Sequence, residues 1–257
     1  MNFPYAFWSN KGGVNPTALA NSLIYHYKLD SNGNDTLGSY NLTTLGSPTF
    51  APGILSNSAS CTTMNNNHFI GTTGGKASIS GAGMSFSMWI SMDASAGTDM
   101  GLYVSKCYDG YFGITADEYM IFNATTPLPD LTFRLYDTVG NYSDLNWGAT
   151  ILQLQNNTYY FVSCVVDTAS TTSYIYVNNA GRVSQNYTPA LGTLNTVSAQ
   201  PFRIGGNKDF YNWQIANRAI TWGGNCKVDD VAIWNRPLTS GEVLYLYNNG
   251  LGRTYPF

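Results

Sequence analysis

The stretch Val228-Asp229-Asp230-Val231-Ala232-Ile233-Trp234, followed directly by Asn235-Arg236-Pro237-Leu238-Thr239, decides the fold that we expect. Its apolar run has the length of one strand and is bounded by turn residues. Thr239-Ser240-Gly241-Glu242 then has the pattern that opens a helix, with an acidic residue in the first turn. We therefore predict that the chain closes with a strand over 228–234 and a short helical turn over 239–248.

Upstream of this block, strand-length segments alternate between apolar and polar residues and are separated by turns rich in glycine, asparagine and proline. In the first segment, Leu23, Tyr25, Tyr27 and Leu29 share one predicted face, and Ile24, His26 and Lys28 the other. The remaining predicted strands cover 84–90, 119–122, 131–136, 151–154, 159–166, 174–178 and 202–204. This succession predicts an all-β antiparallel sandwich over 21–257, with long loops around 107–150 and 206–226, preceded by an arm over 1–20 without helical or strand period.

Five segments, in this order, resemble the laminin-G-like, concanavalin A-like lectin/glucanase jelly-roll superfamily, of the type found on phage virions. They are LIYHYKLD at 23–30, FAPGI at 50–54, MSFSMWI at 84–90, the pair YFV…D and YIYVN within 160–178, and the closing block at 228–250. The resemblance implies a two-sheet jelly roll. Asn178-Asn179 stands where the family usually has Asn-Gly.

The composition of the chain argues against nucleic-acid binding and membrane insertion. The net charge is −3 and Lys plus Arg number only 12, which offers no basic footprint for nucleic acid. Charged residues make up 11% of the chain, against roughly 25% in a typical soluble domain, so uncharged polar side chains must cover much of the surface. The sequence has no secretory signal and no apolar run near the roughly 20 residues that cross a bilayer, so we expect no membrane insertion.

The four cysteines, Cys61, Cys107, Cys164 and Cys226, are widely separated and contain no Cys-x-x-Cys. Their spacing excludes a zinc finger or ribbon. The missing export signal favours four free thiols over disulfides.

We expect no catalysis. Glycan hydrolysis requires two opposed carboxylates, and the Glu-x-Asp-x-x-Glu pattern of the superfamily's glucanases is missing here. The glutamates are Glu118 and Glu242 alone. His26 and His68 are expected to be surface or structural residues, since no Gly-x-Ser-x-Gly elbow accompanies them.

Two kinds of site remain candidates. In the resembled topology the first and last strands are antiparallel neighbours, which would bring Asp30 near Asp229 and Asp230, with Asp35 in the following loop. These oxygens suit Ca²⁺; the alternative is that Asp30 and Asp229 bind turn amides. Loop aromatics with nearby polar groups suit a glycan, a subunit contact or simple packing. These candidates are Tyr108, Asp109, Tyr111, Trp147, Asp209, Tyr211, Trp213 and Trp222.

The arm carries Phe3, Tyr5, Phe7 and Trp8, which pack either on their own domain or on a partner. We expect a non-catalytic structural or adhesive protein of a bacteriophage virion, a capsid decoration or fibre component at the virion surface. Its arm would contact other virion proteins, its loops would contact host or mucus glycans, and it could form a homo-oligomer. The alternative is a free calcium-dependent lectin.

Overall fold

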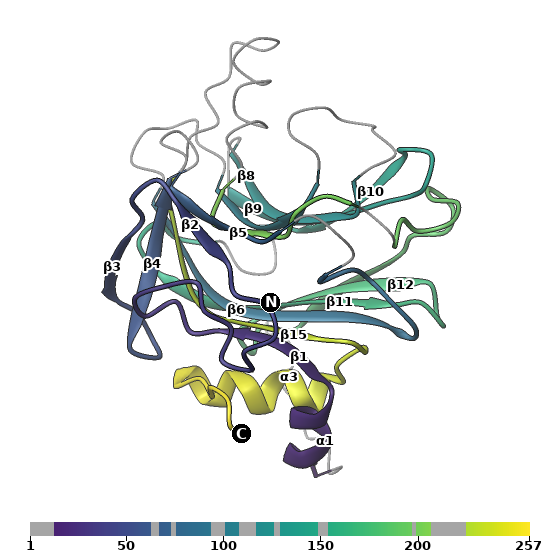
Figure 1. Cartoon of the computed structure of the whole chain (residues 1–257). Helices are drawn as coiled ribbons and strands as arrows, with labels where there is room; N and C mark the ends of the chain where they lie inside the picture. The colour runs from purple at the N-terminus through teal and green to yellow at the C-terminus, as the bar shows by residue number, and fades with distance from the viewer. Residues whose placement is uncertain are drawn as a thin grey trace.

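The computed structural model describes residues 13–62, 67–72, 76–93, 101–107, 117–125, 129–148, 154–196, 199–206 and 225–257. The described part folds into two antiparallel sheets packed face to face, with helices below one of them (Figure 1). The predicted sandwich is confirmed. None of the described helices has the length and hydrophobicity needed to span a membrane.

Among the described residues, the larger sheet has eight strands in the order β13-β12-β11-β6-β15-β4-β3, with β1 also paired to β15. Their bounds are β1 Leu23–Tyr27, β3 Thr49–Pro52, β4 Asn57–Thr62, β6 Gly83–Asp93, β11 Tyr159–Asp167, β12 Thr172–Val177, β13 Arg182–Asn186 and β15 Asn225–Trp234. The second sheet, likewise within the described ranges, has seven strands in the order β10-β9-β8-β7-β14-β5-β2. Their bounds are β2 Thr43–Leu45, β5 His68–Ile70, β7 Leu102–Lys106, β8 Tyr119–Thr125, β9 Pro129–Tyr136, β10 Tyr142–Trp147 and β14 Arg203–Ile204.

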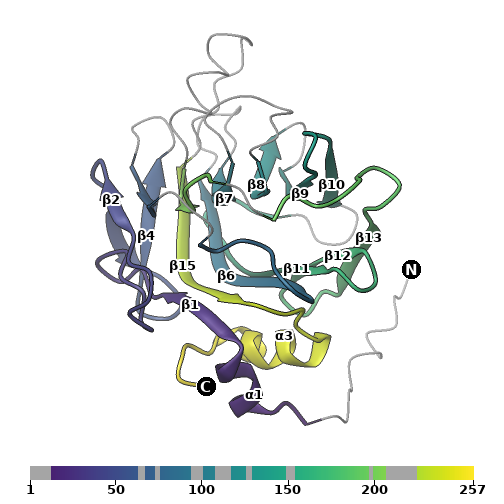
Figure 2. The same cartoon turned by 45° about the vertical axis from the view of Figure 1, so that its right-hand side comes forward.

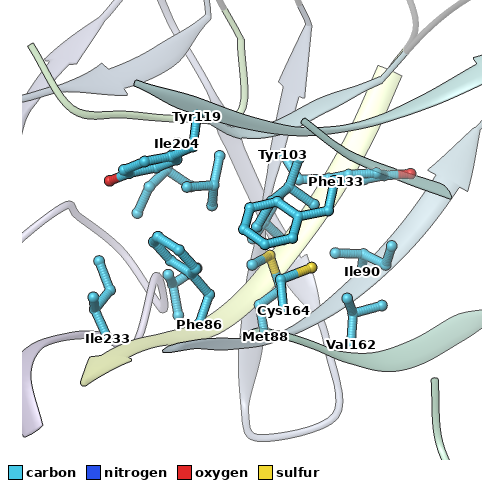
Figure 3. Close-up of a cluster of buried hydrophobic side chains, with 14 of the residues drawn as sticks. Phe86, Met88, Ile90, Tyr103, Tyr119, Phe133, Val162, Cys164, Ile204 and Ile233 are labelled. Atoms are coloured by element: carbon cyan, nitrogen blue, oxygen red, sulfur yellow. The ribbon is translucent and has the colours of Figure 1, made fainter. Parts of the chain in front are cut away.

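The main core lies between the sheets and is made by the alternating residues of the long strands. Phe86 and Met88 of β6 and Cys164 of β11 point up from the eight-stranded sheet, and Tyr119 and Phe133 point down from the other (Figure 3). The Phe86 ring lies 4.8 Å from that of Tyr119 and 6.3 Å from that of Phe133, centroid to centroid. Truncating such a buried ring to alanine costs about 3–5 kcal/mol, so the contact between the sheets is a major source of stability.

Helices lie against the outer face of the eight-stranded sheet (Figure 2), and a second core lies between them and the sheet. There α1 (Pro16–Asn21), α3 (Ser240–Tyr247), a 3-10 turn (Asn248–Gly250) and the C-terminal tail cover Trp89, Phe161 and Trp234. The helix predicted near the end of the chain is confirmed. It begins with a capping box, in which the Thr239 hydroxyl accepts from the Glu242 amide and the Glu242 carboxylate accepts from the Thr239 amide.

Two details of the predicted N-terminal region are wrong. Residues Pro16–Asn21 form a helix, because Asn15 caps it and Pro16 pre-sets its first turn, and its Leu19 is fully buried in the second core. This helix therefore belongs to the folded domain and not to the predicted arm, and Phe3, Tyr5, Phe7 and Trp8 lie outside the described residues. A register shift between Leu23 and Tyr25 also turns Leu23 into the second core, away from the face it was predicted to share.

The first and last strands pair antiparallel, as predicted. On one edge, β15 pairs with β4 through residues 225–228 and with β1 through residues 231–234. Asp229 and Asp230 lie between these two segments, at the point where the neighbour of β15 changes from β4 to β1. The pairing of β15 with β6 is also irregular there, and Asp230 has a φ of 53°. The two aspartates of the closing block therefore lie at a junction of strands.

Candidate functional site

The outer face of β9 and β10 carries three successive cross-strand pairs, which we call the β9–β10 strip. Its members are Thr132, Arg134 and Tyr136 on β9 and Tyr142, Asp144 and Asn146 on β10, paired 132 with 146, 134 with 144 and 136 with 142. The residues between them, such as Phe133 and Leu145, belong to the main core. Period-2 alternation thus places all six strip residues on the face away from the core.

Arg134 organises the centre of the strip. Its Nε and Nη2 donate to the two carboxylate oxygens of Asp144, both at 2.6 Å. The guanidinium lies 4.0 Å from the ring centroid of Tyr142 and 5.4 Å from that of Phe122. Burial lowers the pKa of Arg134, but the hydrogen bond to Asp144, the charge of Asp144 and the interactions with Tyr136 together outweigh it, and the net pKa is raised. The charge is therefore permanent, and the guanidinium fixes both the carboxylate and the aromatic ring.

The strip has a buried side and an exposed side. The β9 residues are buried, whereas Tyr142 is 46% exposed, Asp144 is partly exposed and Asn146 is exposed. The Thr132 hydroxyl donates to Asn146 Oδ1 at 2.7 Å. An aromatic ring, a carboxylate and an amide held in a row are the groups that contact the apolar face and the hydroxyls of a sugar.

Asp137 holds the turn that joins β9 to β10. It is fully buried and accepts from the amides of Val139 at 3.0 Å, Asn141 at 2.8 Å and Gly192 at 3.2 Å, and from Asn141 Nδ2 at 2.8 Å. Burial raises the pKa of Asp137, but these hydrogen bonds, led by that from the Asn141 side chain, lower it overall. The charged carboxylate thus fixes the position of Tyr142 at the start of β10.

Of the loop aromatics predicted to contact glycans, Trp147 is the one that the structure describes. Its predicted loop position is wrong: it ends β10 and is 1% exposed in the main core, because it continues the inward alternation of Ser143 and Leu145. The other residues predicted to contact glycans lie outside the described residues: Tyr108, Asp109, Tyr111, Asp209, Tyr211, Trp213 and Trp222.

The aspartates at the rim bind backbone amides. Asp229 Oδ2 accepts from the amides of Ile54 at 2.8 Å and Leu55 at 3.0 Å, in the turn between β3 and β4, and Asp30 Oδ1 accepts from the amide of Asn57 at 2.9 Å. This is the alternative considered for Asp30 and Asp229. Burial raises the pKa of Asp229 to about 6; the two amides lower it, and the carboxylates of Asp230 and Asp30 raise it.

Asp35 and Asp230 tie further segments to β1. The Asp35 carboxylate accepts from the backbone amides of His26, Leu37, Ser39 and Tyr40. Asp230 Oδ1 lies 2.9 Å from His26 Nε2 and accepts from the Thr254 hydroxyl at 2.6 Å. In the described ranges no group of three or more His, Cys, Asp or Glu is arranged to hold a metal ion, and calcium at these aspartates stays a prediction.

The histidines and glutamates considered for catalysis are buried or held by contacts within the fold. His26 and His68 are buried, which fits the structural alternative and not the surface one. Glu242 caps α3 and pairs with Arg236 Nη2. Glu118 is fully buried 4.0 Å from Lys106 Nζ, whose pKa burial lowers and Glu118 raises, for a net decrease.

The strip itself was missed by the sequence reasoning. A usable signal was present, since Ser143, Leu145 and Trp147 alternate with Tyr142, Asp144 and Asn146, which is a strand pattern with a polar outer face. The pairing of Arg134 with Asp144 depends on strand register and has no signal in either segment alone.

Comparisons with known proteins agree with this architecture. The family model described as the concanavalin A-like lectin/glucanases superfamily matches residues 65–244. A search of curated proteins finds no match to the sequence.

Solved structures with a similar fold include the binding domain of Paraclostridial Mosquitocidal Protein 1, at a TM-score of 0.64 and 16% identity, covering 90% of this chain and 53% of that one. The botulinum neurotoxin serotype D ligand binding domain in complex with N-acetylneuraminic acid has a TM-score of 0.65 and 13% identity, covering 91% and 52%. A botulinum neurotoxin type C structure, whose description says that cell entry of the toxin is dependent upon interaction with two ganglioside molecules, has a TM-score of 0.63 and 14% identity, covering 93% and 53%. The chain spans about half the length of these structures, and at such identities the likeness concerns the fold alone.

Proposed function

The chain belongs to the concanavalin A-like lectin/glucanases superfamily, and from this premise we propose that it is a non-catalytic module that binds carbohydrate at the β9–β10 strip. The observation that carries the proposal is the exposed Tyr142 ring beside Asp144 and Asn146, held in place by the buried Arg134. Because Arg134 and Asp144 are already paired, the surface needs little ordering when a sugar binds.

The chemistry of the strip favours binding over hydrolysis. Glycosidases place two carboxylates across the scissile bond. The strip has a single carboxylate, Asp144, and both of its oxygens accept from Arg134. The structures of similar fold are described as binding domains, which supports the class of function; the ligands named there belong to chains twice as long as the matched part.

The experiment compares two tyrosines, each under an arginine. Tyr142 lies under Arg134, and Tyr174 lies on the other sheet with Arg182 at 5.0 Å. After a glycan array identifies a ligand, Tyr142→Ala should weaken its binding about 10-fold, equivalent to about 1.4 kcal/mol, while Tyr174→Ala leaves it unchanged.

Equal affinity of the Tyr142→Ala variant and the wild type would place the site elsewhere. Silence of the array, with and without Ca²⁺, would reject carbohydrate binding, and dependence on Ca²⁺ would favour the calcium-dependent lectin. Release of reducing sugar from the ligand would reject a non-catalytic role.

The finer proposal is that this module is a structural or adhesive component of a bacteriophage virion, attached through the aromatic segment before α1. The low content of charged residues supports a role in a large assembly, where Tyr and Trp are enriched at contacts. Deletion of residues 1–12 keeps Gly13, the Asn15 cap and the buried Leu19, so the sandwich should fold and lose attachment to the particle. Retained attachment of the folded variant would contradict this anchoring.

A further inference from the structure

Cys61 and Cys226 face each other across two neighbouring strands. Cys61 lies on β4 and Cys226 on β15, and the two are direct register partners in the antiparallel ladder. Both are 0% exposed and belong to the main core. Strand pairing therefore brings together two cysteines that are 165 positions apart in the sequence.

This placement suits a covalent link between the strands. Directly opposed residues of an antiparallel pair have Cα atoms about 4.5–5.5 Å apart, and disulfides join Cα atoms about 4.4–6.8 Å apart. Both side chains point into the core, so neither strand has to turn over to join them.

The surroundings leave room for both sulfur atoms. The Cys61 thiol hydrogen-bonds the Cys226 thiol, and Cys226 Sγ lies 3.7 Å from the carbonyl oxygens of Leu102 and Gly205. Gly205 has a φ of +88°, and a Cβ at this position would lie 2.2 Å from Cys61 Sγ. A side chain at residue 205 would fill the space that the sulfur pair occupies.

We propose that Cys61 and Cys226 form a disulfide modification site, closed by exchange with a small-molecule or protein disulfide. In the first step one thiol loses its proton and attacks the oxidant, forming a mixed disulfide and releasing one reduced thiol. In the second step the other cysteine displaces the oxidant's remaining sulfur. Two cysteine thiols are thereby oxidised to one S–S bond, and one disulfide is reduced to two thiols.

The bridge closes while the chain folds. The attacking group is the thiolate, and in the folded protein the hydrogen bond to Cys226 and burial raise the pKa of Cys61 well above that of a free thiol. The folded, reduced pair is therefore inert, and exchange takes place before β4 and β15 are covered.

Cys164 provides the matched control. It is as deeply buried as the pair, but its register partners on β11's two neighbours are Ile175 and Phe86. Cys164→Ser removes one thiol without touching the proposed bridge.

The experiment is cell-free synthesis of the full chain with either dithiothreitol or a mixture of reduced and oxidised glutathione. The product is quenched with acid, unfolded and alkylated with N-ethylmaleimide, and its mass is measured. With dithiothreitol we expect four alkylated cysteines, and with glutathione two alkylated cysteines and a loss of two hydrogens. Cys164→Ser should then show one alkylated cysteine, and a non-reducing digest should join the peptides of Cys61 and Cys226.

Four alkylated cysteines in the glutathione sample would overturn the proposal. So would a link that involves Cys107 or Cys164, or glutathione retained on Cys61 or Cys226 in place of the cross-link. Circular dichroism of both samples establishes that the sandwich has formed, so the wild-type result stands even where a variant fails to fold.

Discussion

Replacing Asp229 by asparagine should stabilise the protein at neutral pH. The carboxylate is fully buried, and within the described residues its Oδ1 has no hydrogen-bond partner. Its pKa is raised from 3.8 to about 6, mainly by burial. A difference of about 2 pH units, at about 1.4 kcal/mol for each, corresponds to about 3 kcal/mol.

Ionisation of Asp229 lowers the stability of the folded state because the two states bind its proton with different affinities. Because the folded state holds the proton more tightly than the unfolded state, ionised Asp229 destabilises the fold above about pH 6. This cost falls as the pH drops through 6 and is fully relieved below about 4. Asparagine keeps an acceptor for the Ile54 and Leu55 amides without the charge, so Asp229→Asn should gain about 1–3 kcal/mol at pH 7.

Urea unfolding of both proteins from pH 4 to pH 8 measures this difference, which should be large at pH 7 and small at pH 4. Comparing the variant with the wild type removes the contribution of every other titrating group. A stability difference that does not change with pH would refute the reasoning, as would a variant less stable than the wild type at pH 7.

Three further predictions concern Asp137, the cap of the terminal helix and calcium binding. Asp137→Asn should show the opposite pH dependence, because the pKa of Asp137 is lowered; the variant should lose about 1–2 kcal/mol at pH 7, and the loss should shrink as the pH falls below 4, in a urea series extended to about pH 2. Thr239→Ala removes the capping hydroxyl of α3 and should cost about 1 kcal/mol, with Thr239→Ser as the control that retains it; equal midpoints for Ala and wild type would contradict the role of the cap. Calcium at Asp30, Asp35, Asp229 and Asp230, expected from the sequence, predicts that a chelator lowers the Tm and that added Ca²⁺ restores it; an unchanged Tm would reject a structural ion.

Three of the predicted strands have apolar residues on both faces. β6, β11 and β15 supply the main core with one set of alternating residues and the second core with the other. Their segments are therefore apolar on both faces and are readily predicted as strands. Among the strands that were not predicted, β10 and β13 have polar outer faces, and their inner residues include Ser143 and Gln185. For this reason the sequence predicted a loop where β10 lies, and it predicted an exposed ring at Trp147.

The site was harder to predict than the fold for a physical reason. The pairing of β1 with β15 was predictable because the family resemblance implied that the first and last strands are neighbours. Register, in contrast, is set by side-chain packing along the whole strand. The contacts of Arg134 with Asp144, and of Cys61 with Cys226, depend on that register, as does the bulge that redirects Leu23. The N-cap of α1 did have a local signal, Asn15-Pro16. The helix itself has only six residues, which is too short to show a helical period.

The helical layer under the eight-stranded sheet sets how far the domain can be trimmed. The family match begins after β4 and ends inside α3, so a fragment cut to those limits would lose α1, β1, β2, β3, β4, the end of α3 and the tail. The indole of Trp234, whose Nε1 donates to the Leu19 carbonyl and whose ring stacks on Phe257, would then face solvent beside an unpaired edge of β15. Such a fragment should aggregate. A fusion or recombinant version should therefore retain everything from Gly13 to Phe257, because the cooperative unit is larger than the homologous segment.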